Sequence, residues 1–67
     1  MTISTLNTMV SNGTLREHHT ARYKRYISRR SDGVIEPYEG RYGKGYALFT
    51  PAFDSTIYCY ITYYVFN

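Results

Sequence analysis

Ile57-Tyr58-Cys59-Tyr60-Ile61-Thr62-Tyr63-Tyr64-Val65-Phe66 is the most apolar stretch of the chain and consists almost entirely of β-branched and aromatic residues. Such residues favour a strand, and side chains on a strand alternate between its two faces. The pattern predicts a core face of Ile57, Cys59, Ile61, Tyr63 and Val65, and an opposite face of Tyr58, Tyr60, Thr62, Tyr64 and Phe66. A strand this apolar aggregates when its edge is exposed, so we expect it to lie in the centre of a sheet or against a partner.

Two shorter strands are predicted before it. Residues 46–50 form an apolar run that Pro51 stops, and residues 34–36 form another that Pro37 ends or confines to a sheet edge, because proline cannot donate a ladder hydrogen bond. The glycine-rich segment 40–45 between these runs favours a tight hairpin turn that carries basic side chains.

Residues 14–33 carry two conflicting signals. Thr14 and Glu17 match a capping box, which predicts a second helix running toward Tyr26. Asp32-Gly33, flanked by strand-forming residues on both sides, predicts instead a hairpin that joins residues 26–29 to residues 34–36. The two interpretations compete for residues 20–30, and the turn residues favour the strand.

The N-terminal residues predict a short helix. Apolar side chains at Ile3, Leu6, Met9 and Val10 share one helical face, Thr2 is a suitable cap, and Asn12-Gly13 follows the last of them. The whole pattern indicates one α+β domain over residues 1–67, with this helix packed on a three- to four-stranded antiparallel meander.

Size and composition limit the functions to consider. The chain has 67 residues, of which 9 are tyrosine, and a domain of this size buries only about 60% of its unfolded surface. A large active-site cleft is therefore not expected. Cys59 is the single cysteine and lies in an apolar stretch, which fits a structural role in a reducing cytoplasm. Neither a signal peptide nor a membrane span is indicated.

Positive charge is concentrated in one segment. The net charge is only +3, but five cations fall between residues 22 and 30 and are interleaved with Tyr23 and Tyr26. On a strand, this mixture gives cations for phosphates and a ring for base stacking. The alternative is that Tyr23 and Ile27 enter the core while the charges are merely solvated.

The sequence thus supplies three groups of candidate binding residues. They are the basic segment, the basic glycine-rich loop and the outer tyrosine face of the last strand: Arg22, Lys24, Arg25, Tyr26, Arg29 and Arg30; Arg41 and Lys44; and Tyr58, Tyr60 and Tyr64. Because so few aliphatic residues are available, we expect the tyrosine face to be buried against a partner or against a second copy in a homodimer.

His18 and His19 are the only histidines. Adjacent side chains point apart on a strand, and no cysteine or carboxylate lies near them at ligand spacing, so neither a metal site nor a cofactor is predicted. We also expect no catalytic residue, although acid–base work by a histidine with arginines and a tyrosine is the basis of one alternative.

The function favoured by these patterns is a small cytoplasmic, non-enzymatic protein that binds nucleic acid or a nucleoprotein complex with an acidic surface. One such role is a phage- or plasmid-encoded inhibitor of a host nucleic-acid or defence complex. The alternatives are an assembly subunit of a larger particle and a small ribonuclease.

Overall fold

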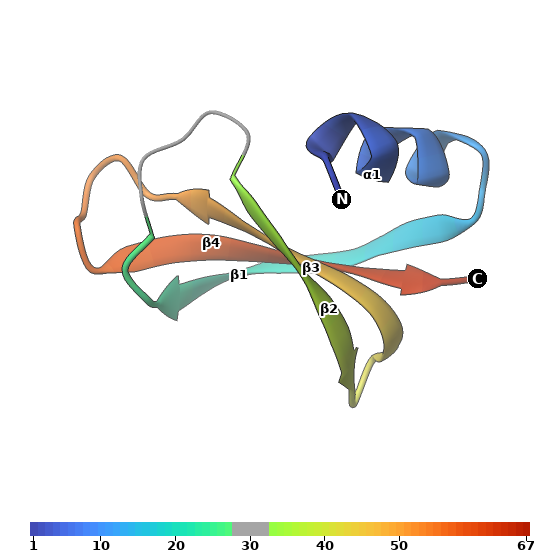
Figure 1. Ribbon diagram of the computed structural model, residues 1–67. Coiled ribbons are helices and arrows are strands. Elements are labelled where there is room, and N and C mark those ends of the chain that lie inside the picture. The colour runs from blue at the N-terminus through green and yellow to red at the C-terminus, as the bar shows by residue number, and fades with distance from the viewer. Residues whose placement is uncertain (28–32) are drawn as a thin grey trace.

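The computed structural model describes residues 1–27 and 33–67. The elements are, in chain order, helix α1 (Ile3–Ser11) and strands β1 (Leu15–Lys24), β2 (Val34–Gly40), β3 (Gly43–Pro51) and β4 (Tyr58–Phe66). The strands form one antiparallel sheet in the order β1-β4-β3-β2, and α1 lies on one side of it, near both chain ends (Figure 1). The predicted α+β fold is confirmed.

Strand β4 has the position and the alternation that its sequence predicts. It lies between β1 and β3, so neither of its edges is free. On the predicted core face, Cys59, Ile61 and Val65 are buried and Tyr63 is half-buried. Ile57 is the exception, because it precedes the strand and is 50% exposed. Burial raises the pKa of the Cys59 thiol, which makes this cysteine a poor nucleophile.

Helix α1 covers one end of the opposite face. Its N-cap is Thr2, whose hydroxyl accepts a hydrogen bond from the Thr5 backbone N–H at 3.2 Å. Leu6 is fully buried and packs in one cluster with Leu15 of β1 and Leu48 of β3. Tyr64 of β4 borders this cluster. The helix predicted from apolar spacing is therefore confirmed, together with the side of it that is buried.

The strand favoured for residues 20–30 is confirmed as far as Lys24, where β1 ends, but two other predictions for residues 14–33 need correction. The helix starting at Thr14 is wrong, because the Asn12 side-chain carbonyl accepts from the Thr14 N–H and hydroxyl, and the chain continues as a strand from Leu15. The hairpin of residues 26–29 with 34–36 is not formed by Tyr26 and Ile27, the described part of its first arm, which lie in no strand; β1 pairs with β4, and β2 pairs with β3. Asp32 and residues 28–31 lie outside the described part of the chain.

The physical reason for the second error is competition for a partner. β4 is long and apolar and offers β1 a full register from Leu15 to Lys24, so β1 and β2 become opposite edges of the sheet. Pro37 lies in β2, which is the edge position expected of a strand proline. The predicted glycine-rich turn is a tight connection at residues 41–42, after which Gly43 has a positive φ of 126°.

The sheet is strongly twisted, since the β2–β3 hairpin crosses the β1–β4 pair at a steep angle in Figure 1. On the face away from α1, Ala47, Phe49, Cys59 and Ile61 form a second buried cluster, against which Ile27 and Val34 pack. Arg25, just after β1, reaches Glu36 of β2 over this face. The two edge strands are thus tied together above Phe49, and the small core is divided between both faces.

Candidate cation–tyrosine surface

Four side chains from β1 and β4 form the candidate site, which we call the cation–tyrosine surface: Arg22, Lys24, Tyr58 and Tyr60. In the register of the two strands Arg22 lies opposite Tyr60, and Lys24 lies opposite Tyr58. They occupy the same sheet face as α1 but the other end of it, and the two tyrosines remain 37% and 39% exposed. The structure therefore brings together two groups that the sequence predicted separately.

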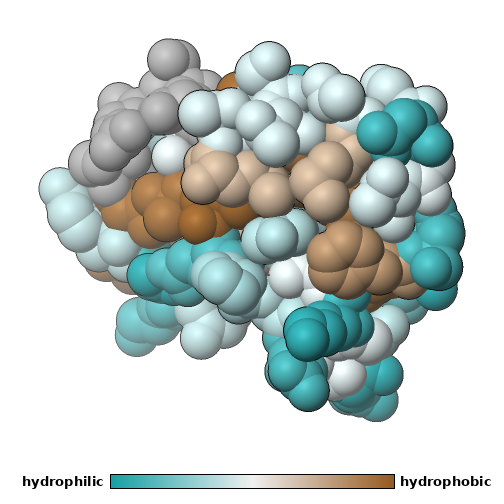
Figure 2. All heavy atoms as spheres, turned by 45° about the vertical axis from the view of Figure 1, so that its right-hand side comes forward, coloured by the Kyte–Doolittle hydropathy of each residue, from teal (hydrophilic) through white to brown (hydrophobic). Residues whose placement is uncertain are grey.

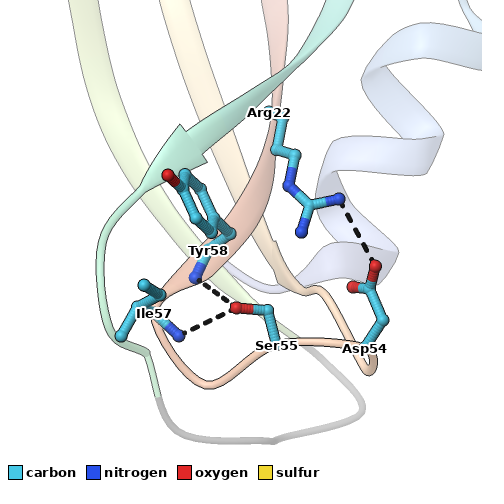
Figure 3. A network of polar contacts seen from close by, with 5 residues as sticks. All are labelled: Arg22, Asp54, Ser55, Ile57 and Tyr58. Carbon is cyan, nitrogen blue, oxygen red and sulfur yellow. Dashed lines mark hydrogen bonds and ion pairs between the residues drawn. The ribbon is translucent and has the colours of Figure 1, made fainter.

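Arg22 and the 52–57 loop hold Tyr58 in place (Figure 3). The Arg22 guanidinium lies 4.9 Å from the centre of the Tyr58 ring and 3.4 Å from the Asp54 carboxylate. In the same loop, the Ser55 hydroxyl accepts hydrogen bonds from the backbone N–H groups of Ile57 and Tyr58, at 3.2 and 3.3 Å. The Arg22–Asp54 pair is exposed, so it orients the arginine while leaving its charge accessible to a ligand.

A pocket continues this surface beyond Tyr58. It has a volume of about 290 Å³ and is lined by Tyr26, Ile27, Pro51, Ala52, Ser55, Thr56 and Tyr58. Tyr26, one of the predicted binding residues, is 76% exposed at its rim. On the side of the molecule drawn in Figure 2, apolar surface is exposed in several places between hydrophilic side chains. Tyr58 and Tyr60 are thus partly exposed rings that lie beside the cations Arg22 and Lys24.

Arg25 lies elsewhere and has a different role. Its guanidinium donates to both carboxylate oxygens of Glu36, at 3.1 and 2.6 Å, and lies 4.4 Å from the centre of the Phe49 ring. The hydrogen-bonded guanidinium lowers the pKa of Glu36, and the carboxylate raises the pKa of Arg25. Arg25 is therefore occupied in closing the sheet face opposite the cation–tyrosine surface.

This ion pair predicts a small loss of stability in acid. Since the pKa of Glu36 is lowered on folding, its contribution is present above the ordinary pKa of a glutamate and is lost as the pH falls from that value through the lowered pKa. The effect is limited because both side chains are 40% exposed, and such pairs contribute about 0–1 kcal/mol. Thermal unfolding followed between neutral and acidic pH should show a smaller acid destabilisation for Glu36→Gln than for the wild type. Identical pH profiles would contradict this expectation.

The remaining predicted binding residues do not all join this surface. Arg41 and Lys44 lie at the β2–β3 turn, at the other end of the sheet. Tyr64 is half-buried beside α1, and burial, followed by the nearby Glu17, raises its pKa. Arg29 and Arg30 lie outside the described residues. Of the predicted groups, the structure therefore places Arg22, Lys24, Tyr58 and Tyr60 side by side, with Tyr26 at the pocket.

The two histidines contradict the expectation that their side chains point apart. The β1–β4 register shifts between Glu17 and His19, which is a β-bulge, and both rings come to the face opposite the cation–tyrosine surface. There the two Nδ1 atoms are 2.7 Å apart, and the Tyr42 ring contacts both imidazoles. Within the described ranges 1–27 and 33–67, no group of three or more His, Cys, Asp or Glu side chains is arranged to hold a metal ion.

Comparison of the chain with protein-family models, with curated proteins and with solved structures gave no match. Across residues 1–27 and 33–67, α1 is the only helix, and it is too short to cross a membrane.

Proposed function

We propose that this protein binds single-stranded nucleic acid through the cation–tyrosine surface. The observation that carries the proposal is the register of β1 with β4, which sets Arg22 beside Tyr60 and Lys24 beside Tyr58 on one open face. Exposed rings stack on bases of any sequence, and neighbouring cations contact the phosphates. The binding is thus expected to be tolerant of sequence and sensitive to salt.

A single strand fits this surface better than a duplex does. Stacking on Tyr58 and Tyr60 requires unpaired bases whose flat faces are free, and a duplex covers those faces. A helix that reads a duplex needs cations for the phosphates that flank the groove, whereas α1, with the sequence ISTLNTMVS, carries no charged residue. The surface therefore supports a stacking mode and gives no support to groove reading.

A nucleoprotein complex offers the same unpaired bases and phosphates, and blocking them would make this protein an inhibitor of such a complex. An isolated strand is the simplest ligand with which to test the surface. An acidic protein partner would contact the cations but would not stack on the rings. Loss of affinity on removal of the tyrosines therefore distinguishes a nucleic-acid ligand from an acidic protein.

The test compares Lys24→Gln with Lys44→Gln by fluorescence anisotropy of a labelled single-stranded oligonucleotide at several salt concentrations. Both variants lose one positive charge, but only Lys24 lies on the cation–tyrosine surface. Lys24→Gln should weaken binding on all sequences and reduce the slope of log affinity against log salt by about 1. Lys44→Gln should leave most of the affinity intact.

Equal effects of the two substitutions would contradict the site, because binding would then follow net charge alone. Poly-glutamate serves as the acidic competitor without bases. If it displaced the oligonucleotide as well as an unlabelled strand of matched charge does, the ligand class would be wrong and an acidic protein surface would take its place.

A further inference from the structure

A β-bulge interrupts β1 at His18. Glu17 lies opposite Tyr64 of β4, and His19 lies opposite the neighbouring Tyr63, so His18 is an additional residue that has no position of its own on β4. Side chains after such a residue face the opposite way from those of an unbroken strand. The bulge therefore decides what the second half of β1 presents on each face of the sheet.

The cation–tyrosine surface depends on this bulge. Leu15, before the bulge, is buried beneath α1 and fixes the first half of β1. Along an unbroken strand that starts from this position, Arg22 would lie opposite Cys59 and would face away from α1. With the bulge, Arg22 lies opposite Tyr60 instead, and Lys24 shares its face. The surface thus carries its cations only while the bulge stays in place.

The side chains after the bulge specify the register of β1 weakly. After His19, the only side chain of this strand that is not exposed is Ala21, and it is only half-buried. Among the described residues, one side-chain hydrogen bond joins this half of β1 to β4, between the Thr20 and Thr62 hydroxyls at 2.9 Å. Since a strand that is polar on both faces is prone to slip, a specific contact is needed to hold the bulge.

The hydrogen bond between the two imidazoles is such a contact. The Nδ1 atoms of His18 and His19 are 2.7 Å apart, so one ring donates its N–H and the other accepts. Adjacent side chains of a regular strand point to opposite faces, so the bond forms only where the strand bulges. The Tyr42 ring contacts both imidazoles, with ring centres 4.5 and 4.7 Å apart, and Tyr63 of β4 contacts His19. The pair is therefore anchored to the β2–β3 turn and to the central strand.

We propose that His18 and His19 are positioning residues of the cation–tyrosine surface, because their hydrogen bond holds the β-bulge and thereby directs Arg22 and Lys24 to the tyrosine face. The imidazoles lie on the other face of the sheet, so they act through the strand and not by contact with the ligand. The consequence for binding rests on the proposed function, whereas the effect on the register stands without it.

The same hydrogen bond makes the register sensitive to pH. It requires one unprotonated Nδ1, and histidine side chains gain their charge between about pH 8 and pH 5. Among the described residues, the charged or titratable side chains around the pair come from every neighbouring element: Arg16 of β1, Tyr38 of β2, Arg41 and Tyr42 of the turn, and Tyr63 of β4.

No carboxylate compensates a second charge on the pair. Glu17 interacts with Tyr64 on the other face, and within residues 1–27 and 33–67 no carboxylate forms an ion pair with either imidazole. When both rings are charged, two N–H groups face each other and the hydrogen bond is lost. Acid should therefore release the bulge.

The test measures binding of a labelled single-stranded oligonucleotide to the wild type, to His18→Ala combined with His19→Ala, and to a variant in which His18 is deleted. The double replacement removes the hydrogen bond but keeps the additional residue, so the second half of β1 should slip. Its affinity should fall at least about tenfold, as when less than about one tenth of the molecules keep the competent register. Deletion removes the need for a bulge, so alternation from Leu15 again directs Arg22 to the tyrosine face, and the affinity should be retained.

The register is measured without a ligand from cross-strand nuclear Overhauser effects of Cys59. The residue opposite Cys59 is Tyr23 in the structure and would be Arg22 after a slip by one residue. We expect Tyr23 in the wild type and in the deletion variant, and Arg22 in the double replacement. Tyr23 opposite Cys59 together with wild-type affinity in the double replacement would overturn the proposal. An equal loss of affinity in the deletion variant would also overturn it, because the imidazoles would then act otherwise than through the bulge.

Lowering the pH from about 8 to about 5 separates control of the register from simple attraction and requires no substitution, so it also applies if the double replacement fails to fold. Additional positive charge strengthens binding to phosphates when charge alone matters. The wild type should instead bind more weakly in acid, and the deletion variant should not. Equal strengthening in both proteins would contradict the proposal. A wild type that binds no single strand at either pH would count against the proposed function, and the pairing of Cys59 would still decide the role of the histidines.

Discussion

Gly45→Ala is expected to abolish the folded state. Gly45 is buried in β3 opposite Val65 of β4. A Cβ atom added at this position would overlap the Tyr64 carbonyl oxygen and would lie 2.8 Å from the Val65 Cα. Both are backbone atoms of the central strand, so no side-chain rotation relieves the overlap, and β3 and β4 would have to separate locally.

The expected size of this effect follows from the size of the protein. A domain of 67 residues has a total stability of roughly 3–10 kcal/mol at about 0.05–0.15 kcal/mol per residue. Disrupting the pairing of the two central strands removes burial from both clusters of the core. We therefore expect Gly45→Ala to show no cooperative thermal transition by circular dichroism.

Gly13→Ala is the matched control. Gly13 also has an unfavourable backbone conformation for alanine, with φ at 84°, but an added Cβ would meet no atom within 4 Å. It should cost about 1–2 kcal/mol through conformation alone and retain a cooperative transition at lower temperature. If the two variants unfolded at the same temperature, the close approach of β3 to β4 would not be the determinant that the structure indicates.

The contrast between β4 and β1 explains which features the sequence could predict. In β4 the side chains alternate without interruption, so apolar content and a period of two were sufficient to predict the strand, its buried face and its central position. In β1 the spacing of Leu15 and Ala21 is even, which predicts one shared face. The structure instead packs Leu15 beneath α1 and Ala21 against the cluster on the other face.

The β-bulge near His18 causes this difference, since one additional residue reverses the facing of everything that follows. Nothing in a period-two pattern predicts where a bulge occurs, so the histidine pair was not predicted. The one sign of the bulge in the sequence is the absence of apolar residues. Residues 16–20 contain no apolar side chain, although Leu15 before them is buried and Ala21 after them is half-buried. Such a polar run in the middle of a strand marks a position where the register is free to shift.

The sequence also could not predict which carboxylates form ion pairs with the arginines of β1 and of the residues that follow it. Alternation along a strand already places Arg22 and Lys24 on one face and Arg25 on the other. It does not predict that Arg22 contacts Asp54 and that Arg25 contacts Glu36. These partners are 32 and 11 residues away, and the sheet order alone decides that they meet. The predicted neighbourhood of cations and aromatic rings is present at Arg22 and Lys24, but the rings are tyrosines of β4.

Combined replacement of Tyr58 and Tyr60 by alanine is expected to abolish measurable binding to single-stranded nucleic acid at physiological salt. Each base stacked on an aromatic ring contributes about 1–3 kcal/mol, so the two rings together correspond to a loss of at least about 30-fold. Because both side chains are already more than one third exposed, their truncation should change the unfolding temperature little. Tyr58→Phe with Tyr60→Phe keeps both rings and should keep the affinity.

Phe66→Ala provides the decisive comparison for this prediction. Phe66 belongs to the same strand and the same face and is 43% exposed, but it lies at the far end, where its ring contacts Tyr46. Removal of this exposed ring should leave binding unchanged if the ligand is recognised by rings placed beside Arg22 and Lys24. Equal losses from Phe66→Ala and from the double tyrosine variant would show that aromatic exposure on the sheet, rather than the pairing of rings with cations, determines binding. The register of β1 with β4 would then have no bearing on function.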